Sequence, residues 1–351
     1  MPEHRGVWGI DIGLAGLKAI RLEYKESAKQ VLATAFDFVP HPKILSQPDA
    51  NPEELIAQAL DTFLSRNQLQ GDGVAIGVPG QTALARFIQL PPVEASKVGE
   101  IVKYEARQQI PFALEEVNLD FQVVGPAPSN PEEQEVLIAA TRKEMVSDRF
   151  AVAEHAGLKP LVMDVESFAQ MAALQLVINQ LPGGGKEQNV AIVDVGANVM
   201  QIAVIRNEQS VYTREQAFGG NQLTADIVAR YGMSPEEAEN AKRSGGLPDD
   251  FEAEVLRPFM ENLSQEVQRA LQFFFTSTSH NAVDHILLAG GSAVIPGLEE
   301  VVHTRTQVPT LVANPFGAMQ TSPRIQLKRL VQDAPSLIVA CGLAMRRFDP
   351  V

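Results

Sequence analysis

The sequence has few of the features that mark secreted and membrane proteins. Cys341 is the only cysteine in 351 residues, so no disulfide can form within the chain. Such a chain suits a reducing compartment, and we expect a cytoplasmic protein. The N-terminus reaches Asp11 too early for a signal peptide. Because no apolar run approaches the roughly 20 residues of a membrane-spanning helix, we expect no direct membrane insertion.

Excess positive charge is also missing. The chain has 29 lysines and arginines against 43 aspartates and glutamates, which gives a formal net charge of −14. Nucleic-acid binders need a basic face for phosphates, so we expect no nucleic-acid partner. The six histidines are scattered, and none pairs with another at a metal-ligand spacing. The stretch Gly183–Lys186 is not a P-loop, because Glu187 stands where that loop needs serine or threonine.

A glycine-broken hairpin is the first informative feature that the sequence does have. The stretch WGIDIGLAGLKAIRL, residues 8–22, joins two apolar strands through a short turn. Gly13 and Gly16 leave backbone N–H groups exposed and let another molecule approach closely. With Asp11 before the turn and Lys18 after it, the pattern predicts a site for an anion such as phosphate. The alternative is an ordinary hairpin in which Asp11 is a turn residue.

A second copy of this pattern opens the second half of the chain. AIVDVGANVMQIAVI, residues 191–205, runs from an apolar strand through Asp194 and Gly196 into another apolar strand. Two such turns suggest a duplicated domain whose halves face one cleft. Asp11 and Asp194 would repel a polyphosphate unless a divalent cation lay between them, and Mg²⁺ suits that position. With 45% hydrophobic residues, the chain is long enough for two domains.

A third segment, near residue 290, predicts a surface for a flat ligand. Residues 286–289 are apolar and are predicted to form a buried strand, followed by the turn Gly290, Gly291 and Ser292. A double glycine at the end of a strand lets an adenine or ribose lie against the backbone. Pro296 then stands at the start of a helix over 297–306. The alternative is a plain strand-to-helix turn.

A fourth segment predicts a charged helix. Ser234 is followed by proline and two glutamates, which is the signature of a capped helix start, and Gly245 ends the helix. Glu239, Lys242 and Arg243 lie three and four residues apart, so they share one face. The alternative to a binding face is a solvated surface with weak ion pairs.

Together these segments resemble the actin-like ATPase superfamily, which includes actin, Hsp70, sugar kinases and the division protein FtsA. The two hairpins look like its phosphate loops, and ILLAGGSAVIPGL, residues 286–298, looks like its adenosine loop. Its two connecting helices would be those that begin near Asp164 and near Ser336. The five segments follow the order of the superfamily. The resemblance implies an α/β actin-like fold of two duplicated domains around a nucleotide cleft, with ATP and Mg²⁺ as ligands.

Within the superfamily the sequence resembles the PilM family of cytoplasmic proteins of type IV pilus assembly. The resemblance rests on RQQIPFALEEV at 107–117 and on ATRKEMVSDRF, EHAGLKP and VMDVESFA between residues 140 and 169. GGNQLTADI, residues 219–227, is shared with FtsA. An FtsA-like inserted subdomain would span 84–160, with helices near 98–109 and 143–155 and strands near 121–124 and 136–140. We expect the first domain over 1–83 and 161–185, the second over 186–330 with a helical subdomain at about 225–275, and a helix over 331–351 that returns to the first domain.

The resemblance implies a role for each loop. Asp11 and Asp194 would hold Mg²⁺, directly or through water. The nucleotide would be bound by residues of the two phosphate loops, the adenosine loop and the charged helix: Asp11, Gly13, Gly16, Lys18, Asp194, Gly196, Asn198, Gly219, Gly220, Glu239, Lys242, Arg243, Gly290, Gly291 and Ser292.

The resemblance also implies a protein partner. PilM-family members bind the cytoplasmic N-terminal tail of the inner-membrane protein PilN in a groove against the inserted subdomain. We expect Arg107, Ile110 and Phe112 near that groove, although the apolar residues of the segment 110–114 suit the subdomain core equally well. FtsA carries an amphipathic membrane helix after its last domain. We expect no such helix after the last predicted helix, which ends at Phe348, and therefore expect membrane contact only through a partner. Pilus motor ATPases are further candidate partners.

The phosphate loops depart from the superfamily pattern in ways that predict slow hydrolysis or none. Leu14 and Ala15 stand where the first loop usually has serine or threonine, and the second loop reads Ala197-Asn198. Missing hydroxyls would leave the transition state poorly stabilised. Glu166 resembles the residue that orients the attacking water, with Asp164 as the alternative. An FtsA-like division protein and a small-molecule kinase are the rival functions, while an Hsp70-like chaperone would need a further substrate domain.

Overall fold

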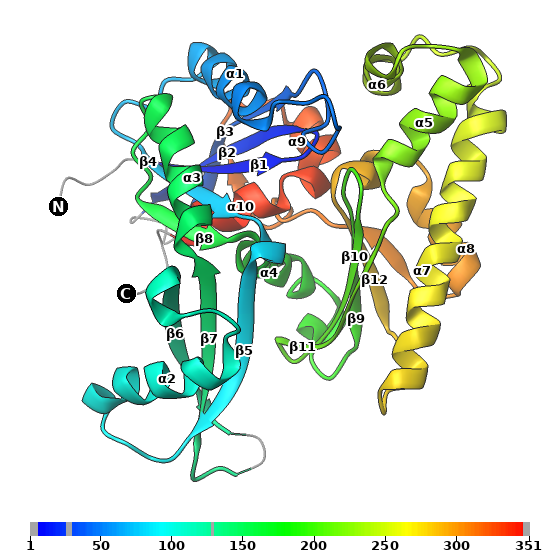
Figure 1. Cartoon of the computed structure of the whole chain (residues 1–351). Helices are drawn as coiled ribbons and strands as arrows, with labels where there is room; N and C mark the ends of the chain where they lie inside the picture. The colour runs from blue at the N-terminus through cyan, green and yellow to red at the C-terminus, as the bar shows by residue number, and fades with distance from the viewer. Residues whose placement is uncertain (1–5, 26–29, 128–129, 347–351) are drawn as a thin grey trace.

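The first domain is built on a mixed six-stranded sheet (Figure 1). The computed structural model describes residues 6–25, 30–127 and 130–346, so residues 347–351 of the expected C-terminal element lie outside the described residues. The strand order of the sheet is β14-β3-β2-β1-β4-β8. Its strands are β1 Val7–Gly13, β2 Gly16–Lys25, β3 Gln30–Pro40, β4 Gly73–Val78, β8 Val162–Val165 and β14 Gln320–Thr321.

The second domain repeats the central part of this sheet. Its five strands lie in the order β11-β10-β9-β12-β13. In both domains the first two strands form an antiparallel hairpin, and a later strand lies parallel to the first strand of that hairpin. Both predicted hairpins are therefore confirmed. The strands are β9 Val190–Val195, β10 Met200–Arg206, β11 Gln209–Gln216, β12 His285–Ala289 and β13 Thr310–Val312.

The described part of the chain contains ten α-helices (Figure 1). The capped helix predicted after Ser234 is confirmed: the Ser234 side chain accepts from the Glu237 N–H, and the Glu237 carboxylate accepts from the Ser234 N–H. The helices are α1 Pro52–Arg66, α2 Ala95–Gln109, α3 Lys143–His155, α4 Glu166–Ile178, α5 Gly220–Tyr231, α6 Pro235–Ser244, α7 Arg257–Ser277, α8 Leu298–Thr306, α9 Leu327–Asp333 and α10 Ile338–Met345.

A small third sheet projects from the first domain (Figure 1). Its strands β5 Ala83–Leu90, β7 Gln134–Arg142 and β6 Val117–Pro126 lie in that order and are antiparallel. Helix α2 covers one face, because Val98, Val102 and Ala106 pack on the buried residues of the strands. Helix α3 falls in the range 84–160 expected for the inserted part, yet it packs on α1 and β4 of the first domain.

Helices α4 and α10 lie between the two large sheets and share one apolar core with both of them. Ile20 of the first sheet, Ile192 of the second, Leu174 of α4 and Ile338 of α10 belong to the same buried cluster. The two helices also approach each other very closely, because a Cβ on Gly342 of α10 would lie 1.7 Å from Ala169 O of α4. The core that joins the domains therefore tolerates little change in volume.

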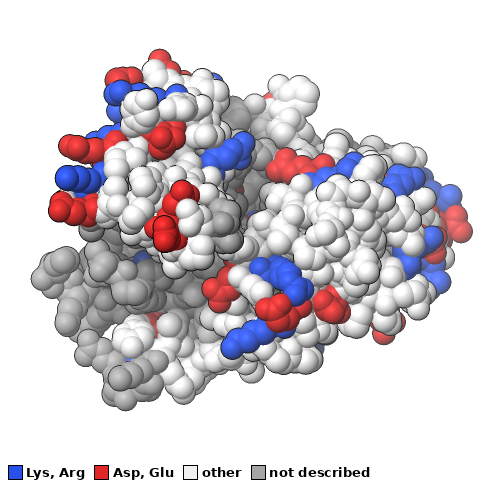
Figure 2. Space-filling model, turned by 90° about the horizontal axis from the view of Figure 1, so that it is seen from below, with Lys and Arg blue, Asp and Glu red and all other residues white. Residues whose placement is uncertain are grey.

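Charged residues are mixed on the surface. On the face that Figure 2 shows, basic and acidic side chains lie in small neighbouring groups, with no large area of one sign. Within the described residues, no helix is both long enough and apolar enough to cross a membrane.

Gly342→Ala is expected to destabilise the protein by about 1–3 kcal/mol, because the added methyl group overpacks the crossing of α4 and α10. The matched control is Gly99→Ala, which also changes a helical glycine but places the new Cβ at an ordinary 3.6 Å from Phe121. Alanine should be neutral or stabilising there, since glycine weakens helices. Thermal unfolding of both variants tests this, and an unchanged melting temperature for Gly342→Ala would contradict the close crossing.

Candidate functional site

Asp11 and Lys18 form a buried ion pair at the first hairpin. The two residues lie directly opposite each other in the β1–β2 register, so their side chains share one face of the sheet. Lys18 Nζ lies 2.8 Å from Asp11 Oδ2. Burial alone would lower the pKa of Lys18, but Asp11, together with Asp194 and Glu166, outweighs it and raises that pKa. Lys18 therefore stays charged in a buried position.

Asp194 of the second domain faces the same ion pair. It lies next to the end of β9, and the Gln170 side chain of α4 donates a hydrogen bond to its carboxylate. Burial raises the pKa of Asp194 to about 6, and the charge of Asp11 adds to this while Lys18 opposes it. The two predicted metal-binding aspartates thus both act on the charge of Lys18, and Asp11 raises the pKa of Asp194.

Glu166 completes the group from the first turn of α4. Its Oε1 atom is buried and has no hydrogen-bond partner. Burial, followed by the charge of Asp11, raises the pKa of Glu166 to about 7. Asp164, the alternative catalytic residue, instead forms an ion pair with Arg346, whose Nε lies 2.6 Å from Asp164 Oδ2. The structure therefore places Glu166 rather than Asp164 with the other carboxylates.

Glycines let the loops around this group approach one another. A Cβ on Gly290 would lie 2.3 Å from Asp194 Oδ1, and its φ of 86° is one that other residues rarely adopt. A Cβ on Gly219 would lie 2.4 Å from Ala197 O, and one on Gly13 would lie 2.9 Å from Lys18 Nζ. Larger residues at these positions would clash with neighbouring atoms, so the close packing of the predicted phosphate loops depends on glycine.

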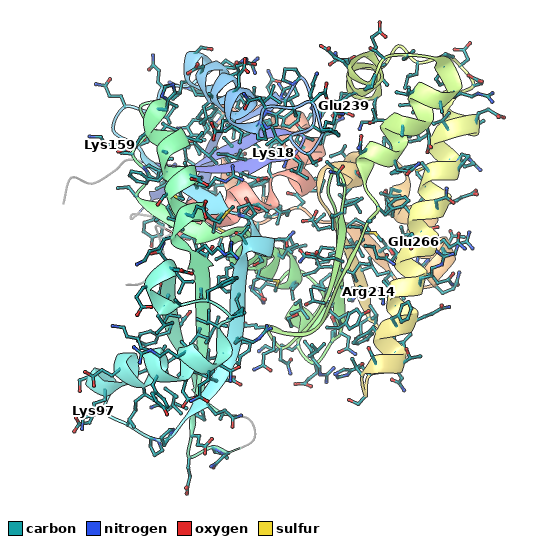
Figure 3. All side chains as sticks on the ribbon, viewed as in Figure 1. Lys18, Lys97, Lys159, Arg214, Glu239 and Glu266 are labelled. Carbon is teal, nitrogen blue, oxygen red and sulfur yellow. The ribbon has the colours of Figure 1, made fainter. Side chains whose placement is uncertain are left out.

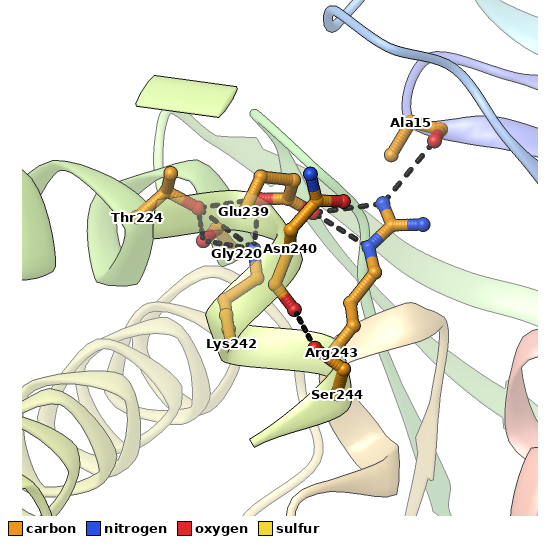
Figure 4. Close-up of polar contacts among 8 residues, drawn as sticks. All are labelled: Ala15, Gly220, Thr224, Glu239, Asn240, Lys242, Arg243 and Ser244. Carbon is orange, nitrogen blue, oxygen red and sulfur yellow. Dashed lines mark hydrogen bonds and ion pairs between the residues drawn. The ribbon is translucent and has the colours of Figure 1, made fainter. Parts of the chain in front are cut away.

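The charged face of α6 turns toward the start of α5 (Figure 4). Lys242 Nζ lies 2.6 Å from Glu239 Oε2 and donates to Gly220 O and to Thr224 Oγ1. Thr224 in turn donates to Glu239 at 2.6 Å. The Lys242 and Glu239 side chains are both largely buried. This face of α6 is therefore not the solvated surface that the sequence left as the alternative to a binding face. A Cβ on Gly220 would lie 2.9 Å from Ser292 Oγ. The adenosine-type turn at residues 290–292 therefore lies next to the start of α5.

Two side chains of the second domain reach across to the first. Arg243 Nη2 donates to Ala15 O at 3.2 Å, and its guanidinium lies 5.0 Å from the centre of the Phe38 ring. The Asn198 side-chain amide donates to Ser46 Oγ. Figure 3 shows Lys18 and Glu239 on the two sides that these contacts join. Arg243 and Asn198, predicted as nucleotide contacts, therefore also bridge the two domains.

The remaining predicted residues of the nucleotide site lie in the same loops. Gly16 begins β2 opposite Gly13, and Gly196 accepts a backbone hydrogen bond from Gly220. Gly291 follows Gly290 and has open space on the side where a Cβ would point. Among the described residues, no group of three His, Cys, Asp or Glu side chains is arranged to hold a metal ion. A divalent cation here would thus need further oxygens, such as those of phosphate and water.

Several contributors to the site were not predicted from the sequence. Gln170 follows Glu166 by four residues on one helix, so helical spacing could have shown that both face Asp194. Thr224 follows Gly220 in the same way. His41 Nε2 lies 3.2 Å from Gly13 O, and its backbone N–H donates to Ala15 O. His41 and Ser46 come from a connection without regular pattern, and nothing in their local sequence pointed to the site.

The three residues predicted for the partner groove differ in accessibility. Arg107 is exposed at the end of α2, and Phe112 is 37% exposed beneath the Arg142 guanidinium, which lies 4.3 Å from the ring centre. Ile110 is only 5% exposed and packs in the core of the small sheet. The Ile110 side chain thus belongs to the core that holds α2 on the strands, which was the alternative for this residue, and its place near a partner groove stays a prediction.

Comparison with known proteins agrees with this geometry. A family model described as type IV pilus assembly protein PilM matches residues 9–348. The chain belongs to the PilM family. It is also similar to a solved PilM–PilN type IV pilus biogenesis complex, with a TM-score of 0.76 and 25% identity over 99% of this chain and 100% of that one. The family resemblance seen in the sequence is confirmed.

More distant relatives support the fold. The EutJ structure from Carboxydothermus hydrogenoformans aligns with a TM-score of 0.53 and 14% identity, over 98% of this chain and 90% of that one. FtsA of Escherichia coli (strain K12) is 26% identical over 207 residues, 49% of this chain and 48% of FtsA. EutJ of the same strain is 28% identical over 123 residues, 35% of this chain and 40% of EutJ. The chain thus spans about half or less of the length of these curated relatives. The solved structures confirm the predicted actin-like fold.

Glu166→Gln is expected to stabilise the ligand-free protein at pH 8 and to leave it nearly unchanged at pH 4.5. A carboxyl whose pKa rises to about 7 on folding contributes stability below its unfolded pKa, and that contribution is lost as the pH rises through 7. Glutamine is neutral throughout, so it avoids this loss, which amounts to about 1–3 kcal/mol at about 1.4 kcal/mol per pKa unit.

Melting temperatures of wild type and variant across this pH range test the prediction. Glu144→Gln, at an exposed glutamate in the first turn of α3, is the control and should show no such pH-dependent difference. A Glu166→Gln protein that is less stable than wild type at pH 8 would show that the carboxylate has a partner that the structure lacks.

Proposed function

We propose that the chain binds ATP with Mg²⁺ between its two domains. The observation that carries this proposal is the meeting of Asp11, Asp194 and Glu166 around Lys18. Carboxylates gathered around a single lysine favour a divalent cation that phosphate and water also bind, and the buried Glu166 Oε1 has no hydrogen-bond partner. Glycines in both hairpin loops and at the turn after β12 allow backbone N–H groups to come close to a polyphosphate beside these carboxylates, so the residues present suit Mg·ATP.

The proposed contacts divide between the two domains. Lys18 and the backbone of Gly13, Gly16 and Gly196 would contact phosphate oxygens, with Asn198 at the edge of the second loop. Mg²⁺ would supply positive charge between the phosphates and the carboxylates of Asp11 and Asp194. The nucleoside would lie among the residues that surround the start of α5 and the adenosine-type turn: Gly219, Gly220, Glu239, Lys242, Arg243, Gly290, Gly291 and Ser292.

Hydrolysis is proposed to be slow or absent. The first loop offers Leu14 and Ala15, which have no hydroxyl, and their carbonyl groups already accept from Leu45 and His41. Glu166 is the residue best placed to orient a water molecule, but its raised pKa leaves it partly protonated near neutral pH. Bound nucleotide would therefore act mainly by holding the two domains together, which suits a scaffold better than a kinase or a division ATPase.

We further propose that the chain binds the cytoplasmic N-terminal tail of PilN. The similarity to a PilM–PilN complex over the full length of both chains supports this partner. The tail would lie against the small sheet near Arg107 and Phe112, where an exposed cation and a half-exposed aromatic ring stand close in sequence. Such a protein would work in the cytoplasm at the inner membrane, held there through PilN, with pilus motor ATPases as further partners.

Asp194→Asn is expected to weaken Mg·ATP binding about tenfold or more at pH 8, a loss of about 1.4 kcal/mol for each factor of ten. Without Mg²⁺ the difference should shrink, because the variant also removes a repulsion of phosphate. Asp249→Asn, at an exposed aspartate of the same domain, is the control. Calorimetric titrations with and without Mg²⁺ measure both effects, and no heat for wild type at millimolar Mg·ATP would refute the proposed function.

Phe112→Ala is expected to weaken binding of a PilN N-terminal peptide by about 1–3 kcal/mol if the ring is a hot spot. The control is Phe273→Ala, since Phe273 is also half-exposed beneath an arginine, Arg214, but lies in the second domain. Fluorescence anisotropy of a labelled peptide tests both variants. Equal loss of affinity in both, or none in Phe112→Ala, would place the groove elsewhere.

A further inference from the structure

A cavity of about 580 Å³ lies on the first sheet, away from the proposed nucleotide site. Its walls come from β2 and β3, from the end of α1 and from the segment 322–329 before and within α9. Trp8 contributes to the lining, and it faces the opposite side of β1 from Asp11 because side chains alternate along a strand. A ligand in this cavity would thus be separated from the Lys18 group by the sheet itself.

The cavity is basic although the chain as a whole is acidic. Four arginines line it, Arg21, Arg66, Arg324 and Arg329, against a single carboxylate, that of Glu23. Arg21 is held by Asp72 through two hydrogen bonds of 2.6 and 2.8 Å, and it also bonds Glu23. This arginine is therefore part of the wall rather than a free binding group.

The other three arginines are held less tightly than Arg21. Arg66 lies 3.5 Å from Asp37, and Arg329 lies 3.5 Å from Asp333. Both distances exceed the 2.7–2.9 Å or so of a charge-assisted hydrogen bond. Arg324 is exposed, and within the described part of the chain its guanidinium makes no ion pair or hydrogen bond. Guanidinium groups in such an arrangement match the oxygens of phosphate.

Two aromatic rings, those of Trp8 and Phe36, lie in the wall beside these cations. Trp8 is only 2% exposed, and its indole Nε1 is buried without a hydrogen-bond partner. Phe36 lines the cavity beneath the Arg329 guanidinium, which lies 5.7 Å from the ring centre. The cavity volume also exceeds what one inorganic anion needs and falls in the range of small-molecule sites. The lining therefore suits a ligand with an organic part as well as a charge.

We propose that this cavity binds a small phosphate ester, with its phosphate held by Arg324 and Arg329 and its organic part against Phe36, close to the buried ring of Trp8. A phosphate group is favoured over a single carboxylate because it offers three terminal oxygens to several guanidinium groups. The site is independent of the proposed nucleotide cleft.

Trp8 makes the site directly measurable, because it is the only tryptophan in the chain. Titration of the full chain with glucose 6-phosphate should change the Trp8 fluorescence in a saturable way, while glucose should not. The double variant Arg324→Glu and Arg329→Glu should weaken binding at least about tenfold, since it removes charge-assisted hydrogen bonds. The control is Lys328→Glu, which reverses an exposed charge next to Arg329 on α9 at a residue that does not line the cavity.

Calorimetry under the same conditions gives the second readout. Selective loss of glucose 6-phosphate binding in the arginine variant, with Lys328→Glu behaving as wild type, supports the proposal. No saturable binding of glucose 6-phosphate up to 10 mM, or about equal loss in both variants, would overturn it. Binding of a tetraglutamate peptide but not of the phosphate ester would also overturn it, in favour of a peptide-docking surface.

Discussion

Lys18 is one buried ammonium group among three carboxylates that come from different parts of the chain. Asp11 lies opposite it in the same hairpin, Asp194 belongs to the second domain, and Glu166 begins the helix between the domains. Burial raises the pKa values of Glu166 and Asp194, and the charge of Asp11 adds to both shifts, because one lysine cannot balance three ionised carboxylates in a low-dielectric interior. The pocket is thus short of positive charge, which a bound divalent cation would supply.

The two domains meet at this point because the same elements build both the site and the core. Helix α4 contributes Glu166 and Gln170 to the site and Leu174 to the core that both sheets share. Arg243 and Asn198 connect the loops at the edge of the site. A ligand that changes the charge balance around Lys18 would therefore act on the contact between the domains, which is how a protein with slow hydrolysis could still respond to nucleotide.

Much of this arrangement could be predicted from the sequence, because hairpins and capped helices are local. Asp11, Gly13 and Lys18 lie within eight residues, and their pairing follows from the strand register. Contacts between distant segments could not be predicted in this way. The hydrogen bond between Asn198 and Ser46 and the ion pair between Arg346 and Asp164 form only when the chain is folded. Ile110 shows the same limit, since an apolar residue at a helix end suits a groove and a core equally well.

The central claim is that a divalent cation and the phosphates of ATP lie between Asp11 and Asp194. A crystal of the chain grown with Mn²⁺ and a non-hydrolysable ATP analogue tests this directly, because Mn²⁺ can be located by its anomalous scattering. We predict an anomalous peak between these two carboxylates, with the phosphates beside Lys18 and the glycine loops. A nucleotide bound elsewhere, or a cleft that contains no Mn²⁺ while the Lys18–Asp11 pair remains intact, would contradict the account.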